Sequence, residues 1–125
     1  MIERTHLLES ALQIDNIKVI MKLYLDKSPE DLRKLVNMIR SETGFLVILA
    51  GLDGKKLSLV VGRSQDIQMD SRKILNLQLK KYNGRGGGDH QLAQGGCNLT
   101  DDQGGNFFSD TIEIIQGNFQ IENTK

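Results

Sequence analysis

The chain of 125 residues has no tryptophan, one proline, one cysteine and two histidines. A single cysteine excludes a disulfide within the chain and is typical of a reducing compartment, so we expect a cytoplasmic protein. Two histidines and one cysteine cannot supply the ligands of a closed Cys/His zinc site. The longest apolar run, residues 45–50, is far too short to span a bilayer, and the N-terminus has no secretory-signal pattern. The sequence therefore predicts no metal site in this chain and no membrane partner.

The chain also lacks net charge, because 16 Lys and Arg balance 16 Asp and Glu. A zero balance argues at first against a nucleic-acid partner, since such proteins are normally basic. The charges are unevenly distributed, however: residues 55–85 carry +6 and residues 86–125 carry −5. The balance is thus a cancellation between two segments, and the basic segment favours an anionic partner.

The apolar pattern predicts one domain of ordinary size. Residues 17–25 are apolar and β-branched, which indicates a strand. Ser28 and Pro29 are typical of a helix start, and apolar residues follow at the spacing of one buried helical stripe: Leu32, Leu35, Val36 and Ile39. Residues 45–50 indicate a strand covered on both faces, and Asp53-Gly54 predicts a hairpin turn into a strand over 56–62. A second helix is expected from Asp70 to the Asn83-Gly84 pair.

This order predicts an α/β (α+β) fold: a mixed sheet with helices packed on it, built from a right-handed strand–helix–strand unit followed by a hairpin. We expect residues 1–16 to be the end of a preceding helix or a linker, with helical spacing over 2–13 that also fits a frayed terminus. The domain is expected at 17–121 and a loose tail at 122–125. Residues 91–97 are expected to add a short strand. Residues 110–116 fit a helix or a strand, and a short helix starting near Ser109 is favoured.

A glycine-rich segment, residues 83–96, follows the second helix and contains six glycines in fourteen residues. Glycine lets a backbone approach a ligand closely, and a run of exposed amides can hold a phosphate. The simplest alternative is a flexible loop, but pure linkers seldom contain Arg and His. The segment has no Walker ending, and it does not fit a dinucleotide fingerprint because its glycines follow a helix rather than open one. We therefore interpret it as a binding loop for an anionic ligand.

Gly84-Arg85-Gly86-Gly87-Gly88 followed by Ala93-Gln94-Gly95-Gly96 closely resembles the glycine motif of the DHH-associated domain, and the preceding elements come in that family's order. Such domains lie at the C-terminus of alanyl-tRNA synthetases and alanyl-tRNA editing proteins, and a related version closes DHH-family phosphoesterases. Asp89 follows the three glycines where the phosphoesterases place a histidine, which brings the chain closer to the alanyl-tRNA group. Cys97 stands where that group usually has another glycine.

The resemblance implies a C-terminal tRNA-binding module, with phosphate contacts from Arg63, Lys80, Lys81 and Arg85. Gly86, Gly87 and Gly88 would let backbone amides approach the nucleic acid, and Asp89, His90 and Gln94 would make specificity contacts. The expected partner is tRNA, alanine-specific or mischarged. No catalytic constellation is present, and any zinc would belong to a separate editing domain of a hydrolase or ligase parent. Two alternatives stay open: the substrate-binding lobe of a phosphoesterase that acts on short oligonucleotides or cyclic dinucleotides, and a homodimerisation module.

Overall fold

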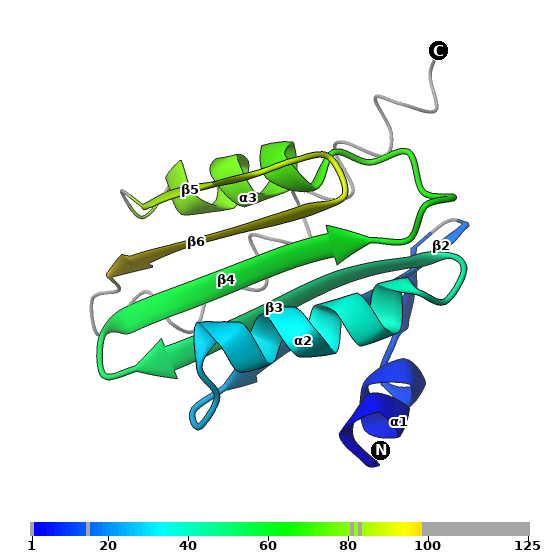
Figure 1. Ribbon diagram of the computed structural model, residues 1–125, viewed down its shortest axis with the longest axis horizontal. Helices are drawn as coiled ribbons and strands as arrows, with labels where there is room; N and C mark the ends of the chain where they lie inside the picture. Colours follow the sequence, from blue (N-terminus) through cyan, green and yellow to red (C-terminus); the bar gives the residue numbers. More distant parts are fainter. Residues whose placement is uncertain (1, 15, 81, 83, 99–125) are drawn as a thin grey trace.

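The computed structural model describes residues 2–14, 16–80, 82 and 84–98 (Figure 1). Within these ranges no helix combines the length and apolar composition that crossing a membrane requires. The elements in chain order are α1 (Ile2–Glu9), β1 (Leu12–Ile14), β2 (Ile17–Tyr24), α2 (Pro29–Arg40), β3 (Phe45–Asp53), β4 (Lys56–Arg63), α3 (Ser71–Lys80), β5 (Arg85–Gly88) and β6 (Leu92–Asn98).

The strands form one six-stranded sheet in the order β1-β2-β3-β4-β6-β5. β2 and β3 are parallel and are joined by α2, whereas the other neighbouring pairs are antiparallel. This arrangement confirms the predicted mixed sheet and its strand–helix–strand unit. Because β6 pairs with β4 rather than with β5 alone, the glycine-rich segment becomes part of the sheet.

The two long helices lie on opposite faces of the sheet, α2 in front and α3 behind in the view of Figure 1. Leu35 and Ile39 of α2 join a buried cluster with Val47, Leu49 and other residues of what we call the α2 face. Leu75 and Leu79 of α3 join a second cluster on the other side, the α3 face, with alternate residues of β3 and β4 such as Ile48 and Leu59. Because side chains alternate between the two faces along each strand, the strands contribute to two hydrophobic cores.

The helix starts form as the sequence predicts. Asp31 N donates a hydrogen bond to the Ser28 hydroxyl at 3.2 Å, and Pro29 occupies the first turn of α2. Asp70 Oδ1 accepts from Arg72 N and Lys73 N at the start of α3. The predicted stripe of α2 is 6% exposed or less at every position, and burying each such side chain stabilises the fold by about 1.5–3 kcal/mol (Leu32, Leu35, Val36 and Ile39).

The N-terminal segment corrects one prediction. The helix expected over residues 2–13 ends at Glu9, and Leu12–Ile14 form an antiparallel edge strand on β2. Ser10 ends the helix because its hydroxyl donates to Leu7 O at 2.8 Å, while the open edge of β2 provides partners for the next backbone groups. The second helix ends at Lys80, and Gly84 N then donates to Leu79 O. The predictions for residues 109–116 and 122–125 lie outside the described ranges.

Candidate nucleic-acid interface

The glycine-rich segment is a β-hairpin, which corrects the predicted binding loop. The short strand expected over 91–97 is confirmed as β6, and residues 85–88, expected to be loop, form β5. The register places Arg85 opposite Gly96 and Gly87 opposite Gln94. β6 in turn pairs with β4 along its whole length. The backbone of Gly95 and Gly96 therefore lies between two strands, whereas Gly86, Gly87 and Gly88 belong to an edge strand with a single neighbour among the described strands.

Packing explains most of the glycines in the hairpin. A Cβ at Gly86 would lie 2.7 Å from Leu75 Cδ2 of α3 and 2.6 Å from Gln94 O. At Gly95 it would lie 2.7 Å from Leu79 Cδ1, and at Gly84 3.1 Å from Leu79 Cβ. The hairpin approaches α3 too closely for side chains at these positions. Gly87 points the other way, and a Cβ there would meet nothing within 4 Å.

The tip of the hairpin is held by its own polar groups. Asp89 Oδ1 accepts from Gln91 N and from Leu92 N, both at 2.9 Å. The hydrogen bond from Leu92 N, followed by that from Gln91 N, lowers the pKa of the Asp89 carboxyl below its ordinary value. This carboxylate, predicted as a specificity contact, forms the turn.

Two arginine side chains and the backbone amide at the start of α3 also form hydrogen bonds with the tip. Arg63 Nε donates to His90 O at 3.1 Å, and Ser71 N donates to the same carbonyl at 2.9 Å. Arg40 Nη1 donates to Gln91 O and Arg63 O, both at 3.3 Å. The imidazole Nδ1 of His90 lies 3.1 Å from Asp70 Oδ2, at the start of α3. Arg63 and His90 therefore anchor the hairpin to the body of the domain.

The structure separates the remaining predicted residues. Lys80 is exposed on α3, where it lines a shallow hollow with Arg72 and Lys73 on the α3 face of the molecule. Arg85 alternates with Gly84 and Gly86, which contact α3, so it lies on the α2 face. Gln94 lies on that face as well, as the partner of Val60. Lys81 lies outside the described residues. The predicted set is thus divided between the tip and two opposite faces.

The α2 face is only half covered, because α2 packs on β3 and β4 while β6 and β5 extend beyond it. A groove of about 440 Å³ runs there between the start of α2 and the strands, lined by Pro29, residues 56–60 and residues 94–98. Its polar side chains are Lys56, Ser58, Gln94 and Asn98. Arg33 of α2 reaches across and donates from Nη1 to Gln94 Oε1 at 3.2 Å.

Arg33 and Arg40 are site residues that sequence reasoning missed. They lie seven residues apart on α2, so both are on the flank of the helix that faces the open strands, one contacting Gln94 and the other the Gln91 carbonyl. Their position beside the buried stripe was the available signal. A count of charge by segment did not point to these arginines, because residues 1–54 carry a net charge of −1.

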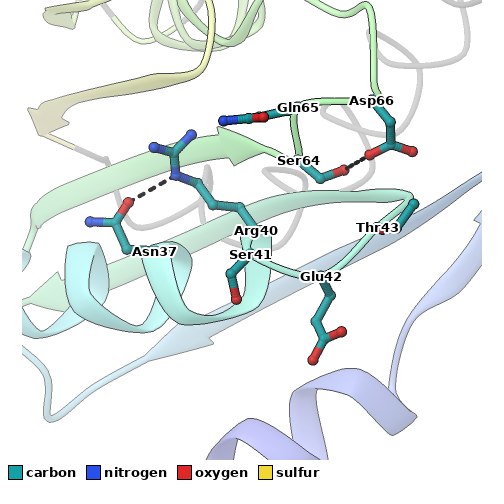
Figure 2. A pocket seen from close by; sticks show the side chains of 8 residues that line it. All are labelled: Asn37, Arg40, Ser41, Glu42, Thr43, Ser64, Gln65 and Asp66. Atoms are coloured by element: carbon teal, nitrogen blue, oxygen red, sulfur yellow. Dashed lines mark hydrogen bonds between the residues drawn. The ribbon is translucent and has the colours of Figure 1, made fainter.

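A larger hollow of about 650 Å³ lies at the C-terminal end of α2 (Figure 2). Arg40 Nε donates to Asn37 Oδ1 at 2.9 Å, and the Ser64 hydroxyl donates to Asp66 Oδ1 at 2.6 Å. The Ser64 bond, with a further one from Gly44 N, lowers the pKa of the Asp66 carboxyl. Figure 2 shows the Glu42 side chain pointing away from these groups. The hollow is lined by positive and negative side chains that already have hydrogen-bond partners. Its lining therefore does not select one class of ligand.

No group of three or more His, Cys, Asp or Glu that could hold a metal occurs in the part of the chain that is described. Burial raises the pKa of the Cys97 thiol, so this side chain is a packed, protonated residue rather than a ready nucleophile.

No protein-family model matches the chain. The alanine–tRNA ligase of Ruthia magnifica is 36% identical over 87 residues, which are 67% of this chain and 10% of the ligase. The alanine–tRNA ligase of Vesicomyosocius okutanii is 32% identical over 93 residues, 72% of this chain and 11% of the ligase. The chain therefore spans about a tenth of the length of the curated relatives it matches.

Solved structures agree with these relatives. The C-Ala domain of Aquifex aeolicus alanyl-tRNA synthetase superposes with a TM-score of 0.75 at 25% identity, over 86% of this chain and 96% of that domain. RecJ of Thermus thermophilus has a TM-score of 0.57 at 17% identity, over 88% of this chain and 15% of RecJ, which shows a shared fold. On this sequence and structural similarity, the chain is a relative of the C-Ala domain of alanyl-tRNA synthetases, with the fold of the DHH-associated domains.

Proposed function

We propose that the chain is a tRNA-binding module of an alanyl-tRNA synthetase or a related editing protein. The tRNA lies on the uncovered half of the α2 face, over β6 and β5. One observation carries the proposal: Arg33 and Arg85 both border this open half, although they lie far apart in the sequence and on different elements. The similarity to alanine–tRNA ligases supports a tRNA as the partner.

The arginines suit phosphates because a guanidinium keeps its charge and presents several donors in a fixed plane. Arg85 is exposed at the start of β5, and Lys56 extends the positive border at the end of the groove. Acidic Glu30 of α2 forms an exposed ion pair with Lys34, 3.8 Å away. A phosphate backbone that follows the open strands would meet these cations in turn.

The first test is a filter-binding titration of the full chain with a tRNA transcript at several salt concentrations. The logarithm of the affinity should fall linearly with the logarithm of the salt concentration. Arg85→Ala should weaken binding and lower the slope by about one. Lys73→Ala removes an exposed cation on α3, on the opposite face of the molecule, and serves as the control, with a slope like that of the natural chain.

Absence of binding at low salt would overturn the proposal, and so would a slope that Arg85→Ala leaves unchanged. Binding of short oligonucleotides with no binding of tRNA would instead support the phosphoesterase-lobe alternative. The preference for an alanine-specific or mischarged tRNA and the homodimer stay predictions of the sequence.

A further inference from the structure

The outer edge of β5 offers backbone groups to a partner. β5 is the last of the described strands in the sheet, and all four of its residues are exposed. In an antiparallel pair, residues that exchange hydrogen bonds with the neighbouring strand alternate with residues that direct their N–H and C=O groups away from it. The pairing of β5 with β6 therefore decides which residues of β5 face outward.

Gly86 and Gly88 are the outward-facing residues. Asp89 N donates to Leu92 O at 2.9 Å, so the backbone of Asp89 is directed towards the other arm of the hairpin. Positions two residues apart on a strand share this direction, and Gly87 therefore also faces β6. The N–H and C=O groups of Gly86 and Gly88 point to the opposite side, away from the sheet.

The distances across the hairpin support this assignment. In an antiparallel ladder, the pairs that exchange no hydrogen bonds have the closer Cα atoms. A Cβ at Gly86 would lie 2.8 Å from Gly95 Cα, and one at Gly88 would lie 2.5 Å from Ala93 Cα. A Cβ at Gly87 would meet no atom within 4 Å. The close pairs are thus those of the two outward-facing residues.

A second copy of the same strand is complementary to this edge. A phosphate diester could accept from the outward N–H groups but has no donor for the C=O groups, whereas another strand supplies both. When two β5 strands run antiparallel about a two-fold axis at Gly87, Gly86 of each copy lies opposite Gly88 of the other. Both pairs then exchange their hydrogen bonds. In the same register, Arg85 of each copy lies opposite Asp89 of the other.

The charges of this register are complementary as well. Arg85 and Asp89 are both exposed, and opposite charges that face each other across two strands stabilise the pairing. Asp89 Oδ1 accepts the hydrogen bonds of the turn, so Oδ2 can accept from the arginine of the other copy without loosening the turn. A guanidinium has five N–H donors, so Arg85 keeps donors for a phosphate in this arrangement.

We propose that the outer edge of β5 binds a second copy of the chain, with the two β5 strands antiparallel about a two-fold axis at Gly87. The axis is perpendicular to the sheet, so one sheet extends across both copies and the open halves of their α2 faces adjoin. This inference gives the homodimer that the sequence predicts an interface, and it does not depend on tRNA binding. A strand of four residues buries less than a standard interface, so we expect a dissociation constant on the order of 0.1–1 mM.

The first test places a cysteine on the axis. In Gly87→Cys, the two new thiols belong to directly opposed residues whose Cα atoms lie about 4.5 Å apart, a separation that a disulfide can bridge. Open space surrounds this position, so the fold accommodates the side chain. Lys73→Cys, exposed on α3, is the matched control, and both variants carry Cys97→Ala so that the new thiol reacts alone. In oxidised glutathione, Gly87→Cys should form a covalent dimer at least about tenfold faster than the control.

The second test follows amide hydrogen exchange in the natural, ¹⁵N-labelled chain by NMR at about 20 μM and about 1 mM. The Gly86 and Gly88 amides should exchange at least about twofold more slowly at the higher concentration, because a partner strand accepts from them. Gly87 should not change, since its N–H already faces β6. Arg85→Glu places like charges opposite each other and should abolish the concentration dependence. Lys73→Glu makes the same change of charge on α3 and should keep it.

Equal rates of covalent dimer formation in the two cysteine variants would overturn the inference. Exchange of Gly86 and Gly88 that does not depend on concentration would overturn it too. A concentration-dependent protection of Gly87 as strong as that of its two neighbours would contradict the alternation on which the register rests. These outcomes are independent of tRNA binding, which the filter-binding titration tests separately.

Discussion

The two ends of the β5–β6 hairpin contain similar residues and use them differently. At the tip, the Asp89 carboxylate accepts from amides of the hairpin itself, and the backbone carbonyls of His90 and Gln91 accept from Arg63, Arg40 and the start of α3. At the other end, residues 94–98 leave amide and backbone groups at an open groove. Glycines and a nearby arginine therefore do not by themselves mark a ligand site. What matters is whether the polar groups already have partners inside the fold.

The largest expected effect concerns the glycines that face α3. Gly86→Ala should lower the free energy of unfolding by about 2–3 kcal/mol, because the new methyl group meets Leu75 and the β6 backbone at 2.6–2.8 Å. Gly87→Ala, one residue away, should change it by no more than about 0.5 kcal/mol, since open space surrounds that position. Urea unfolding followed by circular dichroism measures both. Equal effects of the two substitutions would remove the distinction between the hairpin's faces.

The anchoring of the tip is the next largest effect. Arg63→Ala should cost about 1–2 kcal/mol of stability, because the His90 carbonyl loses a charge-assisted hydrogen bond. Amide hydrogen exchange at Gln91 and Leu92 should accelerate by more than the global loss of stability explains. Arg72→Ala, an exposed arginine at the start of α3, is the control. Unchanged exchange at the tip in Arg63→Ala would show that the tip does not need this anchor.

Acid should loosen the tip through Asp89. Its pKa is lowered in the folded chain, so its contribution to stability is complete above the ordinary aspartate pKa of about 3.9. That contribution is lost as the pH falls through the lowered folded-state value. Asp89→Asn keeps an accepting oxygen for the two N–H groups but does not titrate, and should lose less stability than the natural chain between pH 5 and pH 2.5. Urea midpoints at the two pH values test this, and an equal loss of stability in Asp89→Asn and the natural chain would contradict it.

The smallest expected effect separates the two faces of the molecule. Lys80→Ala should change tRNA affinity by less than about twofold, because Lys80 lies on the α3 face, opposite the open strands, and a single exposed cation outside the interface contributes little. Filter binding at low salt, beside Arg85→Ala, makes the comparison. An effect of Lys80→Ala as large as that of Arg85→Ala would move the interface to the α3 face.

Local patterns account for the parts of the fold that the sequence predicted well. Ser28 and Pro29 start α2, Asp70 starts α3, and the apolar residues 45–50 form a strand covered on both faces. These features depend on a few neighbouring residues and on the period of the apolar side chains. β1 escaped prediction because three residues carry little pattern, and its pairing depends on the free edge of β2.

The site was harder to predict, because exposure of a polar group depends on partners distant in the chain. Arg63 and Asp89 have the right chemistry for a nucleic acid, but their partners are Ser64 and His90 in one case and the neighbouring amides in the other. The sequence did not point to Arg33, because this residue lies in a weakly acidic segment. Its contact with Gln94 joins residues that are 61 positions apart. A charge count along the chain cannot reveal which side of a sheet each charge occupies.

By itself, the sequence determined the types of β2, α2, β3, β4, α3 and β6 and the relationship to the alanyl-tRNA group, since these follow from side-chain period, capping and a local glycine motif. The tertiary structure alone decided that the glycine-rich segment is sheet rather than loop, because the close approach of α3 excludes side chains at Gly84, Gly86 and Gly95. It also decided which arginines face the open strands, because α2 covers only half of one face and leaves β6 and β5 accessible.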